Sequence, residues 1–295
     1  MKVEKVFVMG GGTMGAGIAQ VCAQSGLRVT LCEVSDAALA KAVKGISWSV
    51  GKLIEKGKLK GDLDEIMSRI TPTVSIKDAA GADLVVEAVF ENAEVKHEVF
   101  AGLSPVISEH ALVATNTSAI PITELAGGVI HPERFLGLHF FNPVPMMAAV
   151  EVIRGMATSD EAFAAARQFV LYIGKEPIMV NRDVAGFVIN RINFPSTMEA
   201  MRLVEEGVTS VEDVDKGLRL AAGRRMGIFE TGDMVGLDVT YGALMAMYKE
   251  TGDPKWYPPL LLRRKVKAGH LGKKTGRGWY VYGPDGERIG PAEKS

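Results

Sequence analysis

The sequence predicts an α/β fold in which a Rossmann-type dinucleotide-binding domain precedes a smaller all-α domain. Apolar runs of strand length alternate with helical periodicity through roughly the first 180 of the 295 residues. A glycine-rich turn follows the first of these strands, and strand-like runs become rare after Asp183. We therefore expect two domains, at 1–184 and at 185–295.

Short apolar runs that end at glycine, proline or polar residues are typical of buried strands. The expected strands are Val6–Met9, Arg28–Glu33, Leu84–Ala88, Leu112–Thr115, Phe135–Phe140, Val150–Ile153 and Pro177–Val180. The expected helices between them are Thr13–Gln24, Asp36–Glu55, Val95–Leu103 and Ala162–Ile173. This alternation predicts a mainly parallel sheet that is covered by helices on both faces.

The second part of the chain has the spacing of helices. Apolar positions recur at intervals of three and four residues in Gly186–Val204, Val211–Leu220 and Val235–Tyr248. Only Trp279–Tyr282 has the character of a strand. No repeat of solenoid period occurs, so a repeat architecture is excluded.

Charge and composition exclude several classes of protein. The 34 Lys and Arg residues nearly balance the 35 Asp and Glu residues, so no global field attracts nucleic acid or an anionic membrane. No apolar run is long enough to span a bilayer. Only two cysteines occur, Cys22 and Cys32, which is too few for a disulfide framework and lacks the clustered ligands of a metal site. We expect no nucleic-acid or membrane partner, no metal, and a cytoplasmic location, since no secretory signal precedes the first strand.

The segment VFVMGGGTMGAG at residues 6–17 fits the pattern G-x-G-x-x-G between a strand and a helix. In such a turn the glycines allow a sharp bend, a close approach of the backbone to a pyrophosphate, and tight helix packing. The residues expected to bind the dinucleotide here are Gly10, Gly11, Gly12, Thr13, Met14 and Gly15. Glu33 ends the next strand, where a carboxylate accepts the ribose hydroxyls and repels a 2′-phosphate, so NAD is favoured over NADP. The alternative is a structural glycine turn with a solvated glutamate.

His139 and Glu151 form the second candidate constellation. His139 lies late in the strand FLGLHFF, and Glu151 lies in the next strand, AVEVIRG. Adjacent strands bring such side chains together. A histidine titrates near neutrality and can take the proton of an alcohol, while a carboxylate on its other nitrogen fixes the tautomer. The alternative is a core histidine with a solvated glutamate, because paired titratable groups are often only structural.

Several segments together resemble the L-3-hydroxyacyl-CoA dehydrogenases, most closely the short single-function 3-hydroxybutyryl-CoA dehydrogenases. The segments are VMGGGTMGAGIAQ, LVVEAVFENAEVK, ATNTSAIPITELA, RFLGLHFFNPVP, VEVIRG, RDVAGFVINR, RLVEEG and HLGKKTGRGWY. The resemblance covers nearly the whole chain. It implies oxidation of a 3-hydroxyacyl-CoA with NAD as cofactor.

The resemblance also implies roles for matching residues. His139 and Glu151 match the catalytic pair, and Ser118 and Asn190 match active-site residues that position the reacting oxygen and the thioester. The further cofactor contacts that it implies are Glu91, Lys96, Ser118, Asn142 and Lys274. The contacts to coenzyme A that it implies are Ser49, Lys56 and Ser118. It further implies a homodimer that is formed through the helical domain.

Each of these residues has a plainer alternative. Ser118 with Asn116 can be a turn, and Glu91 with Lys96 can be a solvated pair at a helix start. The six lysines between positions 41 and 60, against one glutamate, can be an exposed helical face. A coenzyme A ligand favours the interpretation that these lysines bind the substrate, because its phosphates bind point cations. Neither this run nor the basic run at 263–277 has the interleaved aromatic residues of a nucleic-acid site.

Three segments depart from the usual family pattern and leave the acyl specificity open. They are Met146-Met147-Ala148-Ala149, Met226-Gly227-Ile228, and Arg224-Arg225 before it. A short-chain substrate such as 3-hydroxybutyryl-CoA is expected, although an arginine at 224 or 225 can pair with a distal carboxylate. Two other functions stay open: a dehydrogenase of a free hydroxy acid on the same fold, and a non-enzymatic NAD-binding protein.

Overall fold

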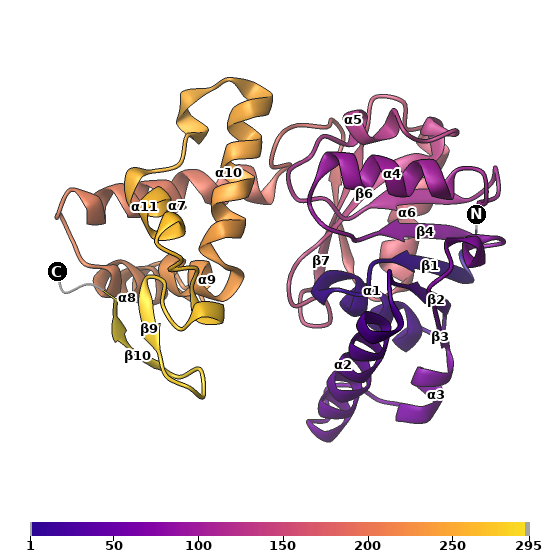
Figure 1. Ribbon diagram of the computed structural model, residues 1–295, viewed down its shortest axis with the longest axis horizontal. Helices are drawn as coiled ribbons and strands as arrows, with labels where there is room; N and C mark the ends of the chain where they lie inside the picture. Colours follow the sequence, from indigo (N-terminus) through magenta and orange to yellow (C-terminus); the bar gives the residue numbers. More distant parts are fainter. Residues whose placement is uncertain (1, 293–295) are drawn as a thin grey trace. The chain divides into compact units, whose positions relative to one another are not determined.

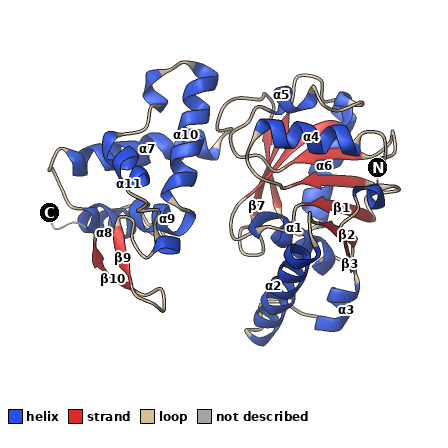
Figure 2. Ribbon diagram, viewed as in Figure 1, coloured by secondary structure: helices blue, strands red, loops and turns tan. Residues whose placement is uncertain are grey.

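A computed structural model describes residues 2–292 and divides into two compact units, Met1–Phe187 and Val188–Ser295 (Figure 1). The first unit has the mainly parallel sheet that the sequence predicts. The second is built mostly of helices (Figure 2). The division follows Phe187, close to the boundary expected at 184.

The sheet of the first unit has eight strands in the order β3-β2-β1-β4-β5-β6-β7-β8. Their bounds are β1 Lys5–Met9, β2 Arg28–Cys32, β3 Ile70–Thr73, β4 Leu84–Glu87, β5 Leu112–Thr115, β6 Phe135–Phe140, β7 Ala149–Arg154 and β8 Glu176–Val180. Neighbours run parallel except β6 and β7, which are antiparallel. The expectation of a mainly parallel sheet is confirmed.

Helices cover both faces of this sheet. The helices α1 (Thr13–Gln24), α2 (Asp36–Glu55) and α6 (Asp160–Tyr172) share one apolar core with alternate strand residues such as Leu136. On α4 (Ala93–Leu103), Phe100 packs edge-on against Phe135 with ring centroids 5.0 Å apart. Phe135 and Leu136 are consecutive in β6 and point to opposite faces, so α4 covers the face opposite the main core.

Short elements at one edge of the sheet and beside it were not expected from the sequence. They are α3 (Leu63–Ser68), β3 (Ile70–Thr73) and α5 (Ile122–Ala126). The strand β3 contains Pro72 and pairs only with β2, which is the edge position where a strand tolerates a missing N–H.

The second unit contains five α-helices and a two-stranded antiparallel hairpin among its described residues. They are α7 Ile189–Glu205, α8 Val211–Ala221, α9 Ile228–Val235, α10 Leu237–Thr251, α11 Leu260–Lys267, β9 Tyr280–Tyr282 and β10 Arg288–Pro291. The helix expected at Val235–Tyr248 begins later, because Gly236 at φ 109° separates α9 from α10. The hairpin extends the single strand-like run that the sequence showed.

Two buried carboxylates hold this unit together. Asp215 on α8 accepts hydrogen bonds from the backbone N–H of Phe229 and the hydroxyl of Tyr280. Asp233 on α9 accepts from the backbone N–H groups of Trp279 and Tyr280. Burial raises the pKa of Asp233. These carboxylates satisfy backbone donors where the hairpin meets the helices, so we assign them a structural role.

The strand order places a ligand-binding edge in the first unit. The chain runs from β1 to β2 and β3 on one side, then returns to β4 on the other side of β1. Ligands of open α/β sheets bind outside the carboxyl ends of the strands at such a switch point. No helix in the described part of the chain is long and apolar enough to cross a membrane.

Candidate active site

The glycine loop at the end of β1 is shaped by close contacts with its own chain. Gly10 has φ +100°, and a Cβ built there would lie 2.6 Å from the carbonyl oxygen of Ala88. A Cβ on Gly15 would lie 1.8 Å from the carbonyl oxygen of Gly10. Both positions therefore require glycine for the strand, turn and helix to pack.

Gly12 differs from these two glycines, because it is exposed and nothing lies within 4 Å of a Cβ built there. It is the N-cap of α1, where no side chain caps the helix and the first turn carries no acid. Packing gives no reason for a glycine at this position. Open space beside uncapped N–H groups and the positive end of a helix fits a pyrophosphate, so the loop fits NAD.

Glu33 lies directly after β2 and is fixed at this loop. Its carboxylate accepts hydrogen bonds from the backbone N–H of Gly11 at 2.6 Å and of Val34 at 2.9 Å. A Cβ on Gly11 would lie 2.9 Å from the Cγ of Glu33, so glycine is required for this approach. The structure thus brings Glu33 and the glycine loop together, as expected for a carboxylate that contacts the adenosine ribose.

His139 and Glu151 are a directly opposed pair on the antiparallel strands β6 and β7. The Nδ1 atom of His139 lies 2.6 Å from Oε2 of Glu151, and the two side chains are 6% and 0% exposed. With Nδ1 bound to the carboxylate, Nε2 has no partner among residues 2–292. The geometry suits a histidine that accepts a proton at Nε2 while a buried carboxylate stabilises its cation.

Two aromatic rings enclose the imidazole. The ring of Phe141 lies 4.7 Å from that of His139, and the ring of Phe187 lies 5.6 Å from it. Phe187 is buried and has φ 48°, a left-handed backbone conformation that is uncommon for a phenylalanine. Sequence reasoning missed both rings, and only the position of Phe141 directly after FLGLHF could have indicated one of them.

Close contacts connect the glycine loop to this pair along the carboxyl edge. Gly10 touches Ala88 at the end of β4, as described above. The side chain of Asn116, after β5, accepts a hydrogen bond at 2.9 Å from the backbone N–H of Phe140, the residue after His139. A Cβ on Gly17 of α1 would lie 2.8 Å from the Cβ of Val144, in the loop after β6. The dinucleotide loop and the histidine therefore share one edge of one unit.

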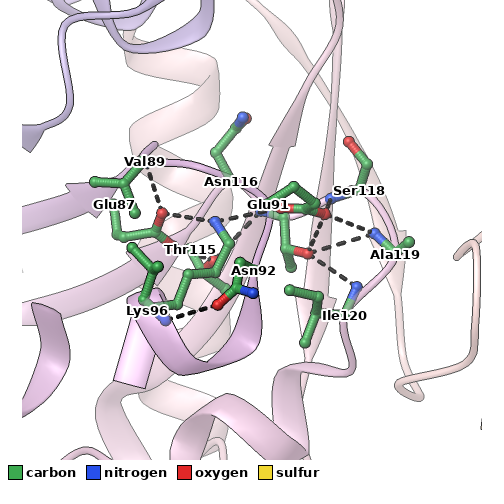
Figure 3. A network of polar contacts seen from close by, with 12 residues as sticks. Glu87, Val89, Glu91, Asn92, Lys96, Thr115, Asn116, Ser118, Ala119 and Ile120 are labelled. Atoms are coloured by element: carbon green, nitrogen blue, oxygen red, sulfur yellow. Dashed lines mark hydrogen bonds and ion pairs between the residues drawn. The ribbon is translucent and has the colours of Figure 1, made fainter. Parts of the chain in front are cut away.

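Ser118 lies between these two features and is held by Glu91. Its backbone N–H donates to Oε1 of Glu91 at 2.7 Å, and the hydroxyl of Thr117 donates to the same oxygen at 2.7 Å. Figure 3 shows this loop folded around the Glu91 carboxylate. The Ser118 side chain is half-buried.

Lys96 is buried in an ion pair and is not the solvated residue of the plainer alternative, and its contact to the cofactor stays a prediction. Its side chain is 1% exposed, and its ammonium group lies 2.6 Å from Glu87 and 3.3 Å from Glu91 (Figure 3). In the sequence, Glu87 is the one acid within the apolar strand LVVEA. The signal that could have revealed the pair is the coincidence of a charged residue in LVVEA with a lysine on the following helix.

The loop between β6 and β7 contains Asn142, which is exposed and precedes a cis peptide bond to Pro143. The ammonium group of Lys175 donates to the carbonyl oxygens of Val144 at 2.8 Å and Met147 at 2.6 Å. Burial lowers the pKa of Lys175. A buried lysine thus fixes the loop that follows the histidine strand.

Ser49 and Lys56 lie on one side of α2. They are seven residues apart, which is close to two helical turns, so their side chains share a face. Ser49 is half-buried, and Lys56 is exposed at the C-cap of the helix. Their contacts to coenzyme A stay a prediction.

The remaining expected residues lie in the second unit. Asn190 lies in the first turn of α7 and is half-buried. The ammonium group of Lys274 lies 2.7 Å from the carboxylate of Asp238. Arg224 is half-buried and Arg225 is exposed. The roles predicted for these four residues stay predictions. Among the residues that the structure describes, no three His, Cys, Asp or Glu side chains gather as a metal site would require.

A glycine loop at the switch point of a parallel sheet, together with a buried histidine–carboxylate pair at the same edge, defines an NAD-binding dehydrogenase. Residues 5–184 match the 3-hydroxyacyl-CoA dehydrogenase NAD binding domain, and residues 186–282 match the C-terminal domain of 3-hydroxyacyl-CoA dehydrogenase. The chain belongs to the 3-hydroxyacyl-CoA dehydrogenase family. The resemblance read from its sequence segments is confirmed.

Relatives of this family are similar over almost the whole chain. The 3-hydroxybutyryl-CoA dehydrogenase of Bradyrhizobium diazoefficiens is 40% identical, covering 95% of this chain and 96% of that protein. The mitochondrial hydroxyacyl-coenzyme A dehydrogenase of Homo sapiens is 42% identical, covering 95% of this chain and 91% of that protein. The crystal structure of (S)-3-hydroxybutyryl-CoA dehydrogenase PaaH1 from Ralstonia eutropha has a TM-score of 0.91 at 42% identity, covering 96% of this chain and 100% of that one.

Proposed function

We propose that this enzyme oxidises the C3 hydroxyl of an (S)-3-hydroxyacyl-CoA to the 3-oxoacyl-CoA with NAD, in a reversible reaction. The observation that carries the proposal is the buried contact of 2.6 Å between His139 and Glu151, at the same edge as the glycine loop. Family membership supplies the reaction class. A short-chain substrate such as 3-hydroxybutyryl-CoA agrees with the names of the relatives.

His139 is the proposed base. Its Nε2 takes the proton of the C3 hydroxyl while Nδ1–H donates to Glu151, whose charge stabilises the imidazolium that forms. The cofactor, when bound, supplies the acceptor for the hydride that leaves C3. The rings of Phe141 and Phe187 exclude water from one side of the imidazole, which strengthens the His139–Glu151 interaction.

Ser118 is the proposed contact to the reacting oxygen. Glu91 accepts a hydrogen bond from the backbone N–H of Ser118 at 2.7 Å, so a carboxylate in the loop between β4 and α4 sets the position of the serine. A hydroxyl held in this way can donate to the oxygen as its proton leaves, and little reorganisation is needed at that moment.

Ser49 and Lys56 are the proposed contacts to coenzyme A. Lys56 is an exposed cation without an ion-pair partner among the described residues, and phosphate groups bind such cations. These contacts would bind the coenzyme A part of the substrate, which a free hydroxy acid does not have. A place in fatty acid metabolism follows from this substrate class.

We further propose a homodimer that forms through the second unit. Large apolar side chains are exposed there, including Ile192 at 66%, Val208 at 64% and Leu220 at 79%. Contiguous exposed apolar surface often marks an interface between subunits, and these three side chains are our candidates for such a surface. Light scattering coupled to size-exclusion chromatography should give twice the chain mass of 31.6 kDa. A mass of one chain at micromolar concentration would contradict the dimer.

NADH absorbance with (S)-3-hydroxybutyryl-CoA and with free 3-hydroxybutyrate tests the function. We expect saturable turnover with the thioester and a kcat/KM at least about 100-fold lower with the free acid, because the acid lacks the coenzyme A contacts. Equal efficiency with both would favour a dehydrogenase of free hydroxy acids. NAD binding without turnover of any 3-hydroxyacyl-CoA would favour a non-enzymatic role.

A further inference from the structure

Three charged side chains form a compact cluster at the carboxyl ends of β4 and β5, where the proposed mechanism uses none of them as a base. Lys96 lies between Glu87 and Glu91, and Figure 3 shows the cluster with its hydrogen-bonding partners. We call Glu87, Lys96 and Glu91 the charged triad. Its two inner members are enclosed, with Glu87 0% and Lys96 1% exposed, whereas the Glu91 side chain is 42% exposed.

Glu87 is a carboxylate rather than a carboxylic acid, because a buried ammonium group and a backbone N–H both donate to one of its oxygens. Lys96 donates to Oε1 at 2.6 Å, the backbone N–H of Val89 donates to the same oxygen at 2.7 Å, and the hydroxyl of Thr115 donates to Oε2 at 2.6 Å. An ionised carboxylate accepts at both oxygens, and an ammonium group in direct contact stabilises this charged form.

The triad therefore contains two negative charges and one positive charge, which leaves an excess of one negative charge. Lys96 lies closer to Glu87, at 2.6 Å, than to Glu91, at 3.3 Å. The buried end of the triad is thus better compensated than the exposed end. The excess charge is centred toward Glu91, whose Oε1 also holds the backbone of Ser118.

The strand order indicates which half of a bound dinucleotide the triad would face. The pyrophosphate fits beside Gly12 at the end of β1, and the adenosine ribose fits at Glu33, after β2. The other half of a bound dinucleotide would then extend to the opposite side of β1, over β4 and β5 toward His139 on β6. Glu91, the exposed end of the triad, would face it there.

We propose that the charged triad makes the nicotinamide end of the site discriminate between the two oxidation states of the cofactor. The nicotinamide ring carries one positive charge in NAD⁺ and none in NADH. An excess negative charge beside the ring stabilises NAD⁺ and has no charge to act on in NADH. Glu87 and Lys96 act through Glu91 and are positioning residues. The proposal rests on the NAD-dependent function proposed above.

Glu87→Gln separates the effect of charge from the loss of a direct contact, because the buried Glu87 side chain is out of reach of the cofactor. The substitution keeps the shape of the side chain and removes one negative charge, so the triad becomes neutral. Coulomb's law gives an effect on the order of tenfold for two unit charges that are about 10 Å apart at an effective dielectric constant of about 20. NAD⁺ should therefore bind about tenfold more weakly relative to NADH.

The experiment measures the dissociation constants of NAD⁺ and NADH by calorimetry for the unmutated enzyme and for Glu87→Gln. The matched control is Thr115→Val, which removes a hydrogen bond to the same carboxylate and leaves its charge. We expect the ratio of the NAD⁺ constant to the NADH constant to rise about tenfold in Glu87→Gln and to stay within about twofold in Thr115→Val. Glu91→Gln should raise the ratio in the same direction and serves as the second variant if Glu87→Gln does not fold.

Equal weakening of both forms in Glu87→Gln would show a structural role and overturn the proposal. An unchanged ratio in a folded Glu91→Gln variant would overturn it as well. Failure of the unmutated protein to bind either form of the cofactor would instead refute the NAD-dependent function, and this inference with it. The readout is binding, so the result does not depend on which acyl-CoA the enzyme prefers.

Discussion

Replacing Glu151 with glutamine removes a negative charge from beside His139 and keeps the shape of the side chain. Glu151 is fully buried and lies 2.6 Å from Nδ1 of the histidine, so solvent does not screen the contact. A hydrogen bond to a charged group contributes about 1.5–3 kcal/mol, and burial places this one at about 2–3 kcal/mol. Because about 1.4 kcal/mol corresponds to tenfold in rate, kcat should fall about 30- to 150-fold.

The assay is steady-state NADH formation with saturating NAD and (S)-3-hydroxybutyryl-CoA. The chain offers a matched control in the exposed pair of His131 and Glu133, whose Nδ1 and Oε1 atoms lie 3.2 Å apart with side chains 41% and 52% exposed. Glu133→Gln should leave kcat within about twofold, since exposed ion pairs contribute little. Circular dichroism and the melting temperature report whether each variant is folded.

A folded Glu151→Gln variant with more than a third of the normal kcat would refute the reasoning. It would mean that the buried carboxylate does not stabilise the imidazolium. A comparable loss in Glu133→Gln would show that the assay responds to general effects of the substitution. Increased KM at unchanged kcat would assign Glu151 to ground-state binding.

Four further predictions concern the cofactor and substrate contacts. Glu33→Ala should narrow the preference for NAD over NADP about tenfold in kcat/KM, because the carboxylate that opposes a 2′-phosphate is lost. Gly12→Ala should weaken NAD binding without lowering the melting temperature, since nothing lies within 4 Å of its Cβ, whereas Gly15→Ala should lower the melting temperature, since its Cβ would lie 1.8 Å from a carbonyl oxygen. Lys56→Ala should raise KM for the acyl-CoA several-fold with little change in kcat, because it removes binding that the ground and transition states share. Arg224→Ala should lower any preference for an ω-carboxylated 3-hydroxyacyl-CoA over an unsubstituted chain of equal length, as measured by kcat/KM.

Each of these predictions has a contradicting result. Equal catalytic efficiency with NAD and NADP in the unmutated enzyme would show that Glu33 does not select NAD over NADP. A large loss of stability in Gly12→Ala would show that packing requires this glycine. For Lys56, the effect should shrink with a pantetheine thioester, and an equal loss with both substrates would mean that it does not contact the coenzyme A end. If the unmutated enzyme shows no preference for an ω-carboxylated substrate, Arg224 does not pair with a distal carboxylate.

The parts of the fold that sequence predicts are those in which local patterns agree with tertiary packing. The run from β1 through the glycine loop to β2 was predicted closely, because glycine spacing, apolar strands and helical periodicity all indicate the same turn. The neighbouring β3 was missed, because an edge strand of four residues with Pro72 in it has no strand pattern. The helix expected from Val235 begins at Leu237 as α10, and the short helix α9 before Gly236 was not predicted. One glycine inside a helical pattern is usually tolerated, so Gly236 gave no signal of a boundary.

The candidate site was predictable where two short motifs lie on neighbouring strands. His139 and Glu151 follow this rule, because register alone brings them together. The enclosure of Lys96 was not predictable, since it depends on how α4 packs over β4, and a lysine on a helix is ordinarily exposed. The left-handed backbone of Phe187 carries no local signal either, because such a conformation is favoured for glycine and rare for phenylalanine.

The most direct test of the central claim is the rate of NADH formation in a single turnover of His139→Gln with (S)-3-hydroxybutyryl-CoA. Loss of a general base typically costs about 10²–10⁴-fold, so the rate should fall by that factor. The dissociation constant of NAD should stay within about threefold, because the glycine loop and Glu33 are untouched. A variant that binds NAD normally and keeps more than a tenth of the single-turnover rate would contradict the assignment of His139 as the base.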